Sequence, residues 1–176
     1  MNLKQYLISS KTHDALFEQL DTYKPDYALY RDKENSNYDT NAKEFIAFCK
    51  QASSIKSFLH QKVNLAKDLG ATGVHLTSLQ FDSIEDAKSK GLEVIISTHT
   101  YEEVLQAEKL GADAVTYSPI FASPNKGKPK GLADLHKLLE QTNIKVFALG
   151  GIVSQDDIDK IKKSQSYGFA SIRYFD

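Results

Sequence analysis

Three kinds of group in the second half of the chain could act on an anionic substrate: a histidine, a lysine and a pair of glycines. They are His99, Lys126 and Gly150-Gly151. An imidazole transfers protons near neutral pH, and an ammonium group attracts anions. Glycine amides can approach an anion closely because no Cβ atom intervenes. Together these groups would suit proton transfer on a substrate with an anionic tail.

Each group lies beyond a short apolar run that predicts a strand buried on both faces. The three runs are Leu92–Ile96, Ala114–Tyr117 and Val146–Leu149. In parallel α/β sheets, ligands bind outside the carboxyl ends of the strands. The histidine, the lysine and the glycines are therefore expected at the same edge of the sheet.

Strand and helix patterns alternate through the whole chain. The other predicted strands are Tyr6–Ile8, Asp26–Tyr30, Ser57–His60, Gly73–Leu76 and Phe169–Arg173. Eight strands separated by seven helices predict a closed parallel (β/α)8 barrel, a TIM barrel shortened at the C-terminus because no eighth helix follows. An open doubly wound sheet is the alternative fold.

Helix starts are predicted from capping boxes, in which a polar cap residue is followed three positions later by an acidic residue. The pairs are Asn41 with Glu44, Ser83 with Asp86, Thr100 with Glu103, and Ser154 with Asp157. The helix Val63–Leu69 is expected to end at Gly70, because glycine is common just past a helix C-terminus.

Length and composition indicate one soluble domain spanning residues 1–176. A net charge of -1 and a pI near 6.5 give no general attraction to nucleic acid or to a membrane. The single Cys49 excludes an internal disulfide. No export signal and no run of 18 apolar residues is found, so a cytoplasmic location is expected.

An anion site is predicted at the last two strands. Gly150-Gly151 precedes the helix that starts at Ser154, and Arg173 ends the final predicted strand. TIM barrels often bind phosphate between their seventh and eighth strands. The alternative is that the glycines only form a tight turn between strand and helix.

Further cations follow other strands. Lys126, Lys128 and Lys130 share a loop rich in proline and glycine, where the first lysine is the candidate anion contact and the others are expected to be solvated. Arg31 and Lys33 follow the second predicted strand, where ion pairs with Asp32 or Glu34 are the alternative.

The histidines divide by position. His99 could transfer protons or merely orient a turn, whereas His75 and His60 fall in apolar strands and are expected to be hydrogen-bonded core residues. His13 and His136 are expected on helix surfaces. No metal site is predicted, because Gln61, Ser78 and Gln80 stand where carboxylates would be needed and Asp32 alone would bind magnesium poorly; no serine stands on a Gly-x-Ser-x-Gly turn either.

Taken in order, these motifs resemble the family of thiamine phosphate synthases and the related thiazole tautomerases (TenI-like proteins), over nearly the whole chain. The matching segments are Tyr30-Arg31-Asp32-Lys33, Gly73-Val74-His75-Leu76, Ser97-Thr98-His99 with Glu102-Glu103, Ser118-Pro119-Ile120-Phe121 through Lys126, and Ala148-Leu149-Gly150-Gly151-Ile152. The resemblance implies a (β/α)8 barrel that acts in thiamine biosynthesis.

Departures from the family pattern bear on the reaction. Synthases are expected to carry two aspartates that hold magnesium for a pyrimidine diphosphate, and here Gln61 and Gln80 match those positions. Neutral amides cannot replace two anionic ligands of a hard cation. Leu29 stands where the family has glutamine, and Arg173 where it has serine.

The resemblance therefore favours a metal-independent thiazole tautomerase, an isomerase without a cofactor, with His99 as general acid and base on a carboxythiazole phosphate. The expected binding residues are Gly150, Gly151, Ile172, Arg173, Lys126, Arg31, Lys33 and Ser97. The alternatives are a magnesium-dependent thiamine phosphate synthase, a transferase, and a non-catalytic binder of thiazole or thiamine phosphate. A homodimer that covers the flank left by the missing helix is a further hypothesis.

Overall fold

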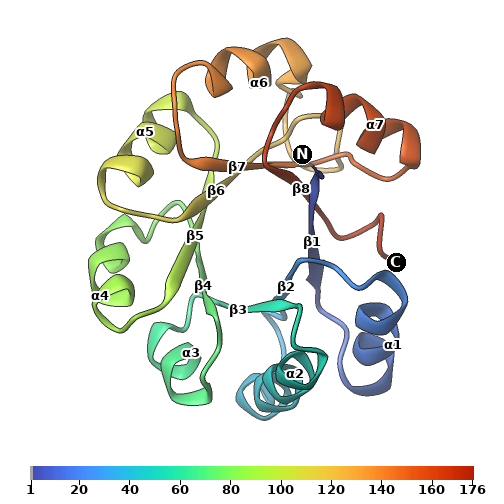
Figure 1. The fold of residues 1–176 in the computed structure, drawn as a ribbon, viewed down its shortest axis with the longest axis vertical. Coiled ribbons are helices and arrows are strands. Elements are labelled where there is room, and N and C mark those ends of the chain that lie inside the picture. Colours follow the sequence, from blue (N-terminus) through green and yellow to red (C-terminus); the bar gives the residue numbers. More distant parts are fainter. Residues whose placement is uncertain (1) are drawn as a thin grey trace.

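The chain, described over residues 2–176 in a computed structural model, forms a closed barrel of eight parallel strands (Figure 1). Each strand pairs with the next in sequence, and β8 pairs with β1. The strands are β1 Lys4–Ser9, β2 Tyr27–Tyr30, β3 Lys56–His60, β4 Gly73–Leu76, β5 Glu93–Thr98, β6 Ala114–Tyr117, β7 Lys145–Leu149 and β8 Gly168–Ser171. The predicted TIM barrel is confirmed, and the open sheet is excluded.

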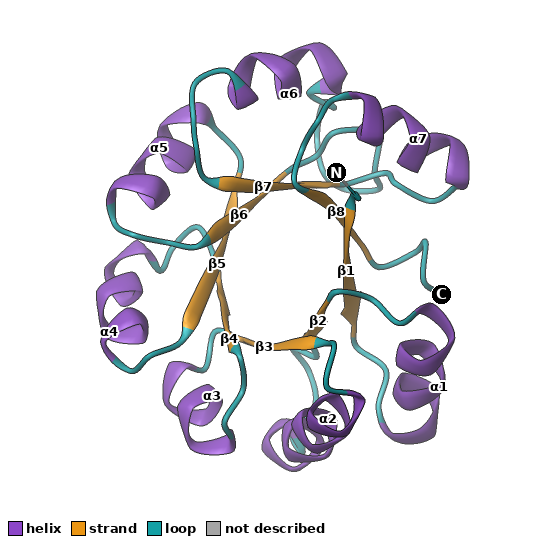
Figure 2. Ribbon diagram, viewed as in Figure 1, coloured by secondary structure: helices purple, strands orange, loops and turns teal. Residues whose placement is uncertain are grey.

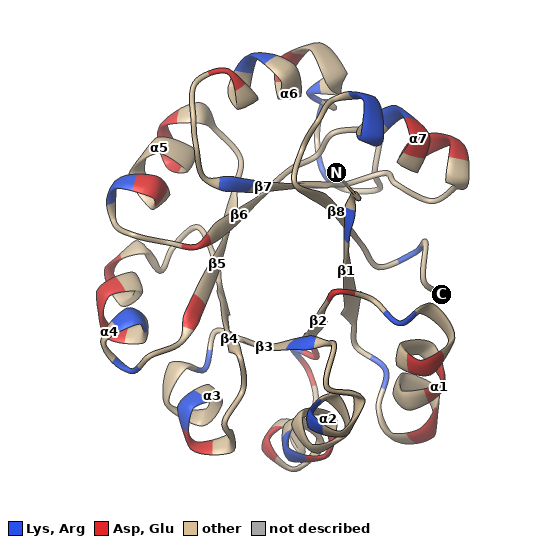
Figure 3. Cartoon of the chain, viewed as in Figure 1, with Lys and Arg blue, Asp and Glu red and all other residues tan. Residues whose placement is uncertain are grey.

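Seven α-helices surround the strands (Figure 2). They are α1 His13–Tyr23, α2 Tyr38–Ala52, α3 Val63–Leu69, α4 Ile84–Ser89, α5 Tyr101–Lys109, α6 Gly131–Leu139 and α7 Gln155–Lys163, with a short 3-10 helix η1 at Phe81–Ser83 before α4. Charged residues of both signs are spread around this outer ring (Figure 3). Across residues 2–176, no helix combines the length and apolarity needed to cross a membrane.

The barrel interior is filled by aromatic rings at its amino-terminal end. The Tyr6 ring packs against Tyr27, Phe58 and Phe147 at centroid distances of 5.9, 6.0 and 5.1 Å. Glycines make room for these rings: a Cβ atom on Gly73 would lie 2.5 Å from a Phe58 ring atom, and one on Gly168 would lie 2.7 Å from the Phe147 ring. The interior is therefore a packed core that leaves only the ends of the barrel for ligands.

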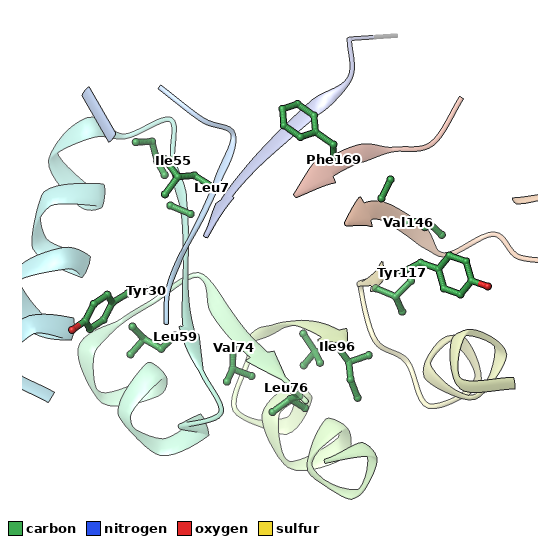
Figure 4. Close-up of a cluster of buried hydrophobic side chains, with 14 of the residues drawn as sticks. Leu7, Tyr30, Ile55, Leu59, Val74, Leu76, Ile96, Tyr117, Val146 and Phe169 are labelled. Carbon is green, nitrogen blue, oxygen red and sulfur yellow. The ribbon is translucent and has the colours of Figure 1, made fainter. Parts of the chain in front are cut away.

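A second apolar layer lies between the strands and the helices (Figure 4). Because successive strand residues point to opposite faces, Leu7, Tyr30, Val74 and Tyr117 face this layer while their neighbours face the barrel axis. Only every second side chain of a strand therefore points into the barrel interior.

The C-terminal segment after β8 occupies the gap between α7 and α1 (Figure 1). Phe175 is 1% exposed, and its carbonyl accepts a hydrogen bond from the Gln19 side chain at 2.8 Å. The Phe175 ring packs edge-on against Tyr23 on α1 and stacks on Phe169 of β8. This segment covers part of the flank that an eighth helix covers in a complete (β/α)8 barrel.

The structure corrects several predicted element ends. Helix α2 begins at Tyr38, so the capping box predicted at Asn41 is wrong. Asn41 is buried within the helix, where its side chain donates to the Tyr30 hydroxyl at 3.4 Å. Ser83 precedes α4 but makes no side-chain cap, whereas the box of Ser154 and Asp157 is confirmed. Thr100 caps α5 by accepting from the Glu103 amide.

Two predicted strands have different ends. Strand β5 continues through Ser97 and Thr98, which places His99 directly after its last residue. Strand β8 stops at Ser171, so Ile172 and Arg173 lie beyond it, contrary to the predicted strand Phe169–Arg173. The hydroxyl of Ser171 donates to the Ile152 carbonyl at 2.8 Å and accepts from the Tyr174 amide at 3.1 Å, which turns the chain away from the barrel.

Candidate active site

The candidate site lies at the mouth, which is the end of the barrel where the carboxyl ends of the strands meet. Ligands of this fold bind at that end. The structure places His99, Arg31, Lys33, Ser97, Gly150 and Gly151 at or just beyond these strand ends. The backbone at these positions therefore lies at one edge of the barrel, as predicted. The contacts of each side chain determine what it can do there.

His99 is exposed and held at two points after β5. Its amide donates to the Glu103 carboxylate at 2.5 Å, and its ring Nδ1 lies 3.2 Å from the Ser118 carbonyl oxygen and 3.3 Å from the Ser118 hydroxyl. A carbonyl oxygen only accepts, so the shorter of the two contacts favours the tautomer with the ring proton on Nδ1, in which the Ser118 hydroxyl oxygen accepts as well. In the neutral imidazole, Nε2 then carries the free lone pair that can accept a proton.

The positive charges of Arg31 and Lys126 both act on Lys33 at the mouth. Burial lowers the pKa of the half-buried Arg31. The charge of Arg31, then burial, then the charge of Lys126 lower the pKa of Lys33. Since Lys126 belongs to the loop after β6, on the far side of the ring from β2, the loop must carry it toward Lys33 (Figure 1). Cations whose charges act on one another in this way favour an anion nearby.

The alternative for Arg31 and Lys33 was an ion pair with neighbouring carboxylates. Among residues 2–176, neither forms an ion pair with Asp32 or Glu34. The Asp32 carboxylate instead accepts from the Tyr30 hydroxyl and the Glu34 amide, both at 3.4 Å. The two cations are thus available to a ligand.

The other two lysines of the β6–α6 loop behave differently from Lys126. Lys126 and Lys128 are both exposed, but only the charge of Lys126 is among the causes that lower the pKa of Lys33. The ammonium of Lys130 lies 4.9 Å from the centre of the Tyr117 ring. The Lys130 amide also donates to the Pro119 carbonyl at 2.9 Å, which closes the base of the loop. Only the first lysine of the three is therefore positioned against the other mouth cations.

Gly150 and Gly151 have positive φ angles of 103° and 70° and pack directly against the β6–α6 loop. A Cβ atom on Gly151 would lie 2.5 Å from the Ala122 carbonyl oxygen, and one on Gly150 would lie 2.8 Å from the Pro119 Cα. This contact requires glycine even without a ligand. The tight-turn interpretation is thus sufficient to explain the pair, and phosphate binding there stays a prediction.

The start of α7 is already occupied by a carboxylate of the chain. Asp157 Oδ2 accepts from the amides of Val153 and Ser154, each at 3.1 Å. Burial alone would raise the pKa of Asp157, but the hydrogen bonds from Ser154 and Val153 outweigh burial and lower it. A phosphate near Gly151 would therefore have to use amides other than these two. Ile172 and Arg173, the other residues predicted there, are exposed after the end of β8.

A hydrogen-bonded row runs from the barrel interior toward the mouth. The Tyr6 hydroxyl lies 2.7 Å from Nδ1 of His75, and Nε2 of His75 lies 2.9 Å from the hydroxyl of the half-buried Ser97. Burial, then the charges of His60 and Arg31, lower the pKa of His75 to about 3. His75 is thus a neutral, hydrogen-bonded core residue, as predicted.

His60 is only partly a core residue. It lines a cavity of about 370 Å³ at the mouth, together with Asp32, Lys33, Asn35, Tyr38, Gln61 and Lys62. Burial, then the charges of Arg31 and Lys33, lower its pKa to about 4, so the ring is neutral at pH 7. The prediction for His60 missed this cavity. The signal in the sequence was alternation along the strand, because His60 lies two residues after Phe58, which faces the barrel axis.

Gln61 and Gln80, which the resemblance matches to magnesium ligands of synthases, do not suit that ion. The Gln80 side-chain oxygen accepts from the amide and hydroxyl of Thr77 at 3.1 and 3.3 Å, and Gln61 is exposed. Within residues 2–176, no group of three or more His, Cys, Asp or Glu side chains is arranged to hold a metal. Magnesium bridging a diphosphate prefers carboxylate oxygens, which these amides do not supply.

Tyr6 and Thr116 are inward-facing polar residues to which the sequence pattern assigns no role. Tyr6 falls in a predicted strand and Thr116 in a predicted apolar run. Both face the barrel axis, because they alternate with Leu7 and Val115, which face the helices. Alternation along the predicted strands was the signal that could have found them.

Comparison with known proteins identifies the family. The family model described as thiamine monophosphate synthase matches residues 5–175. The chain is 36% identical over 137 residues to a putative thiamine-phosphate synthase 2 of Aquifex aeolicus, covering 76% of this chain and 73% of the relative. It is 32% identical over 149 residues to a thiamine-phosphate synthase of Caldivirga maquilingensis, covering 81% and 71%.

A solved structure agrees with these relatives. Thiamine phosphate pyrophosphorylase from Pyrococcus furiosus superposes with a TM-score of 0.81 at 26% identity, covering 97% of this chain and 85% of that one. The family model alone spans nearly all of the described barrel. The chain therefore belongs to the thiamine phosphate synthase family of thiamine-biosynthesis enzymes.

Proposed function

We propose that this protein is a thiazole tautomerase that aromatises a carboxythiazole phosphate without a metal ion, with His99 as general acid and base. The observation that carries the proposal is the contact of the His99 ring with the Ser118 carbonyl, which leaves Nε2 as a free base at the mouth. The amides at the family's magnesium positions support the metal-free reaction.

In the proposed reaction, Nε2 of His99 takes a proton from the saturated ring carbon of the exocyclic tautomer. The electron pair moves through the ring to the exocyclic carbon, which receives a proton from the imidazolium. The molecular formula is unchanged and the ring becomes aromatic. The Ser118 carbonyl helps because it accepts from Nδ1–H and so stabilises the imidazolium that forms.

Substrate anions would be held by two groups of residues. Arg31, Lys33 and Lys126 suit one anionic group, either the carboxylate or the phosphate. Gly151, Ile172 and Arg173, which follow β7 and β8, are the predicted contacts for a second anionic group. Ser97, which is half-buried beside His75, is proposed to contact the ring.

Thiamine phosphate synthase is the second candidate, and the names of the relatives favour it over the tautomerase. The cations Arg31, Lys33 and Lys126 would also suit a diphosphate leaving group. The residues Gln61 and Gln80 count against it, because they leave the diphosphate without the expected metal ligands. The two candidates differ in substrate and in their response to magnesium.

The test measures both reactions with one preparation. The protein is supplied with the exocyclic carboxythiazole phosphate tautomer, and separately with pyrimidine diphosphate plus thiazole phosphate, each with and without magnesium. We expect aromatisation without magnesium, and a loss of about 10²- to 10⁴-fold in kcat for His99→Asn. His136→Asn is the matched control, because that histidine is exposed on α6 and its ring lies 3.5 Å from the Glu140 carboxylate, away from the strand ends.

Other outcomes separate the alternatives. Magnesium-dependent formation of thiamine phosphate would establish the synthase instead. Ligand binding without turnover in either assay would indicate a non-catalytic binder. Full aromatisation activity in His99→Asn would remove the imidazole from the mechanism.

A further inference from the structure

Tyr6, His75 and Ser97 form a hydrogen-bonded chain whose proton positions can be assigned from its two ends. Tyr6 is fully buried, and its hydroxyl contacts only Nδ1 of His75 within residues 2–176, at 2.7 Å. The other ring nitrogen, Nε2, contacts the Ser97 hydroxyl at 2.9 Å. A neutral imidazole donates through one nitrogen and accepts through the other.

The buried end decides the direction. If Nδ1–H donated to Tyr6, the phenol hydrogen would be buried without an acceptor, which costs free energy. If Tyr6 donates to Nδ1, the phenol hydrogen and both ring nitrogens of His75 are satisfied. His75 then carries its proton on Nε2 and donates to Ser97.

The charge states of both rings agree with this assignment. Burial, then Tyr27 and Tyr38, raise the pKa of Tyr6 well above its usual value, so the phenol keeps its proton. The low pKa of His75 keeps the imidazole neutral, with a single ring proton to place. Neither ring therefore changes its role near neutral pH.

We propose that Tyr6 and His75 are positioning residues that fix the Ser97 hydroxyl as a hydrogen-bond donor to the ligand, so that the mouth selects a ligand atom that only accepts. Because His75 already donates to the Ser97 oxygen, the hydroxyl hydrogen of Ser97 is free. A ring nitrogen of a heteroaromatic ligand, or a carboxylate oxygen, is the kind of atom that would receive it.

The buried hydroxyl of Thr116 lies in the same part of the barrel interior as Ser97. Thr116 on β6 is the register partner of Ser97 on β5, and its side chain is fully buried. Its Oγ1 atom has no hydrogen-bond partner within residues 2–176. An unpartnered hydroxyl is rare in a buried position, and here it lies beside the hydroxyl assigned to the ligand.

The proton assignment is tested without any ligand. In the nitrogen NMR spectrum of the histidine-labelled protein, we expect Nδ1 of His75 to resonate as an unprotonated nitrogen and Nε2 as a protonated one. In Tyr6→Phe, this preference should weaken. The control is Tyr27→Phe, because the Tyr27 hydroxyl contacts Tyr167 and not His75. A protonated Nδ1 in the unsubstituted protein would overturn the inference.

The role of Ser97 is tested by binding of the aromatic carboxythiazole phosphate. This part rests on the proposed function, whereas the NMR assignment does not. We expect Kd to rise about three- to tenfold in Ser97→Ala and in Tyr6→Phe, with no further rise in the double variant, since Tyr6 acts only through Ser97. Additive effects would show that Tyr6 acts elsewhere. If this compound does not bind the unsubstituted protein, the proposed function fails while the NMR result still decides the proton positions.

Discussion

At the residue scale, two histidines of this barrel have opposite environments that suit opposite roles. His99 is exposed, and its Nδ1 is committed to a backbone carbonyl, which leaves a base at the mouth. His75 is 3% exposed, neutral, and satisfied at both nitrogens by hydroxyl groups. Exposure suits proton exchange with a substrate, whereas burial suits holding a fixed proton.

The buried histidines should make stability depend on pH. In the folded protein the pKa of His75 is about 3 and that of His60 about 4, whereas an unfolded histidine has a pKa of about 6.5. As the pH falls below about 6.5, the unfolded state therefore binds more protons, and the free energy of unfolding decreases.

Urea unfolding at a series of pH values measures this effect. Where only the unfolded histidine is protonated, each such group contributes a slope of about 1.4 kcal/mol per pH unit. His75→Gln should reduce the slope between about pH 6 and pH 4 relative to the unsubstituted protein. An equal slope in both proteins would contradict the burial of a neutral His75.

At the element scale, the positions of strands were largely predictable but the helix starts were not. The strands Gly73–Leu76 and Ala114–Tyr117 and the helix Val63–Leu69 agree with their predictions. A short apolar run favours a strand, and a glycine such as Gly70 ends a helix, without help from distant residues. These elements can therefore be predicted from the sequence alone. The box at Asn41 failed because packing against Tyr30 placed that residue inside α2.

The candidate site was predictable to a similar degree. The residues after the strands, such as His99 and Arg31, could be found because parallel strands bring their ends together. The approach of Lys126 to Lys33 depends on the path of a long loop, which no local pattern encodes. The Tyr6–His75–Ser97 row joins β1 to the neighbouring strands β4 and β5, which are distant from β1 in sequence, so it could be seen only in the closed barrel.

The two serines predicted to start helices, Ser154 and Ser83, differ in whether they cap, so each serves as the control for the other. Ser154 accepts from the Asp157 amide at the start of α7, whereas Ser83 makes no side-chain cap before α4. Ser154→Ala should lower the free energy of unfolding by about 1 kcal/mol, and Ser83→Ala should change it little. Chemical denaturation of both variants checks this, and equal losses would contradict the difference between the two helix starts.

At the scale of the whole molecule, the C-terminal segment covers part of the barrel flank between α7 and α1. Phe175 connects β8 to α1 through its contacts with Phe169, Tyr23 and the Gln19 side chain. The bare flank that suggested a homodimer is thus partly covered by the chain itself, and the dimer stays a prediction.

Removal of the Phe175 ring tests the importance of this segment. Phe175→Ala should lower the free energy of unfolding by about 3 to 5 kcal/mol, because the ring is almost fully buried. Phe48→Ala is a useful comparison, since that ring is stacked on Phe17 in the outer layer of helices α1 and α2. A loss below about 1 kcal/mol for Phe175→Ala would mean that the segment is not part of the folded core.

The family places the protein in thiamine biosynthesis, and the proposed reaction depends on His99 at the mouth of the barrel. The most direct measurement is the rate at which the exocyclic carboxythiazole phosphate becomes aromatic in the presence of a strong metal chelator. We predict full activity of the unsubstituted protein under these conditions, and a decrease of at least about 10²-fold for His99→Asn. A rate that disappears with the chelator and returns with magnesium would contradict the account.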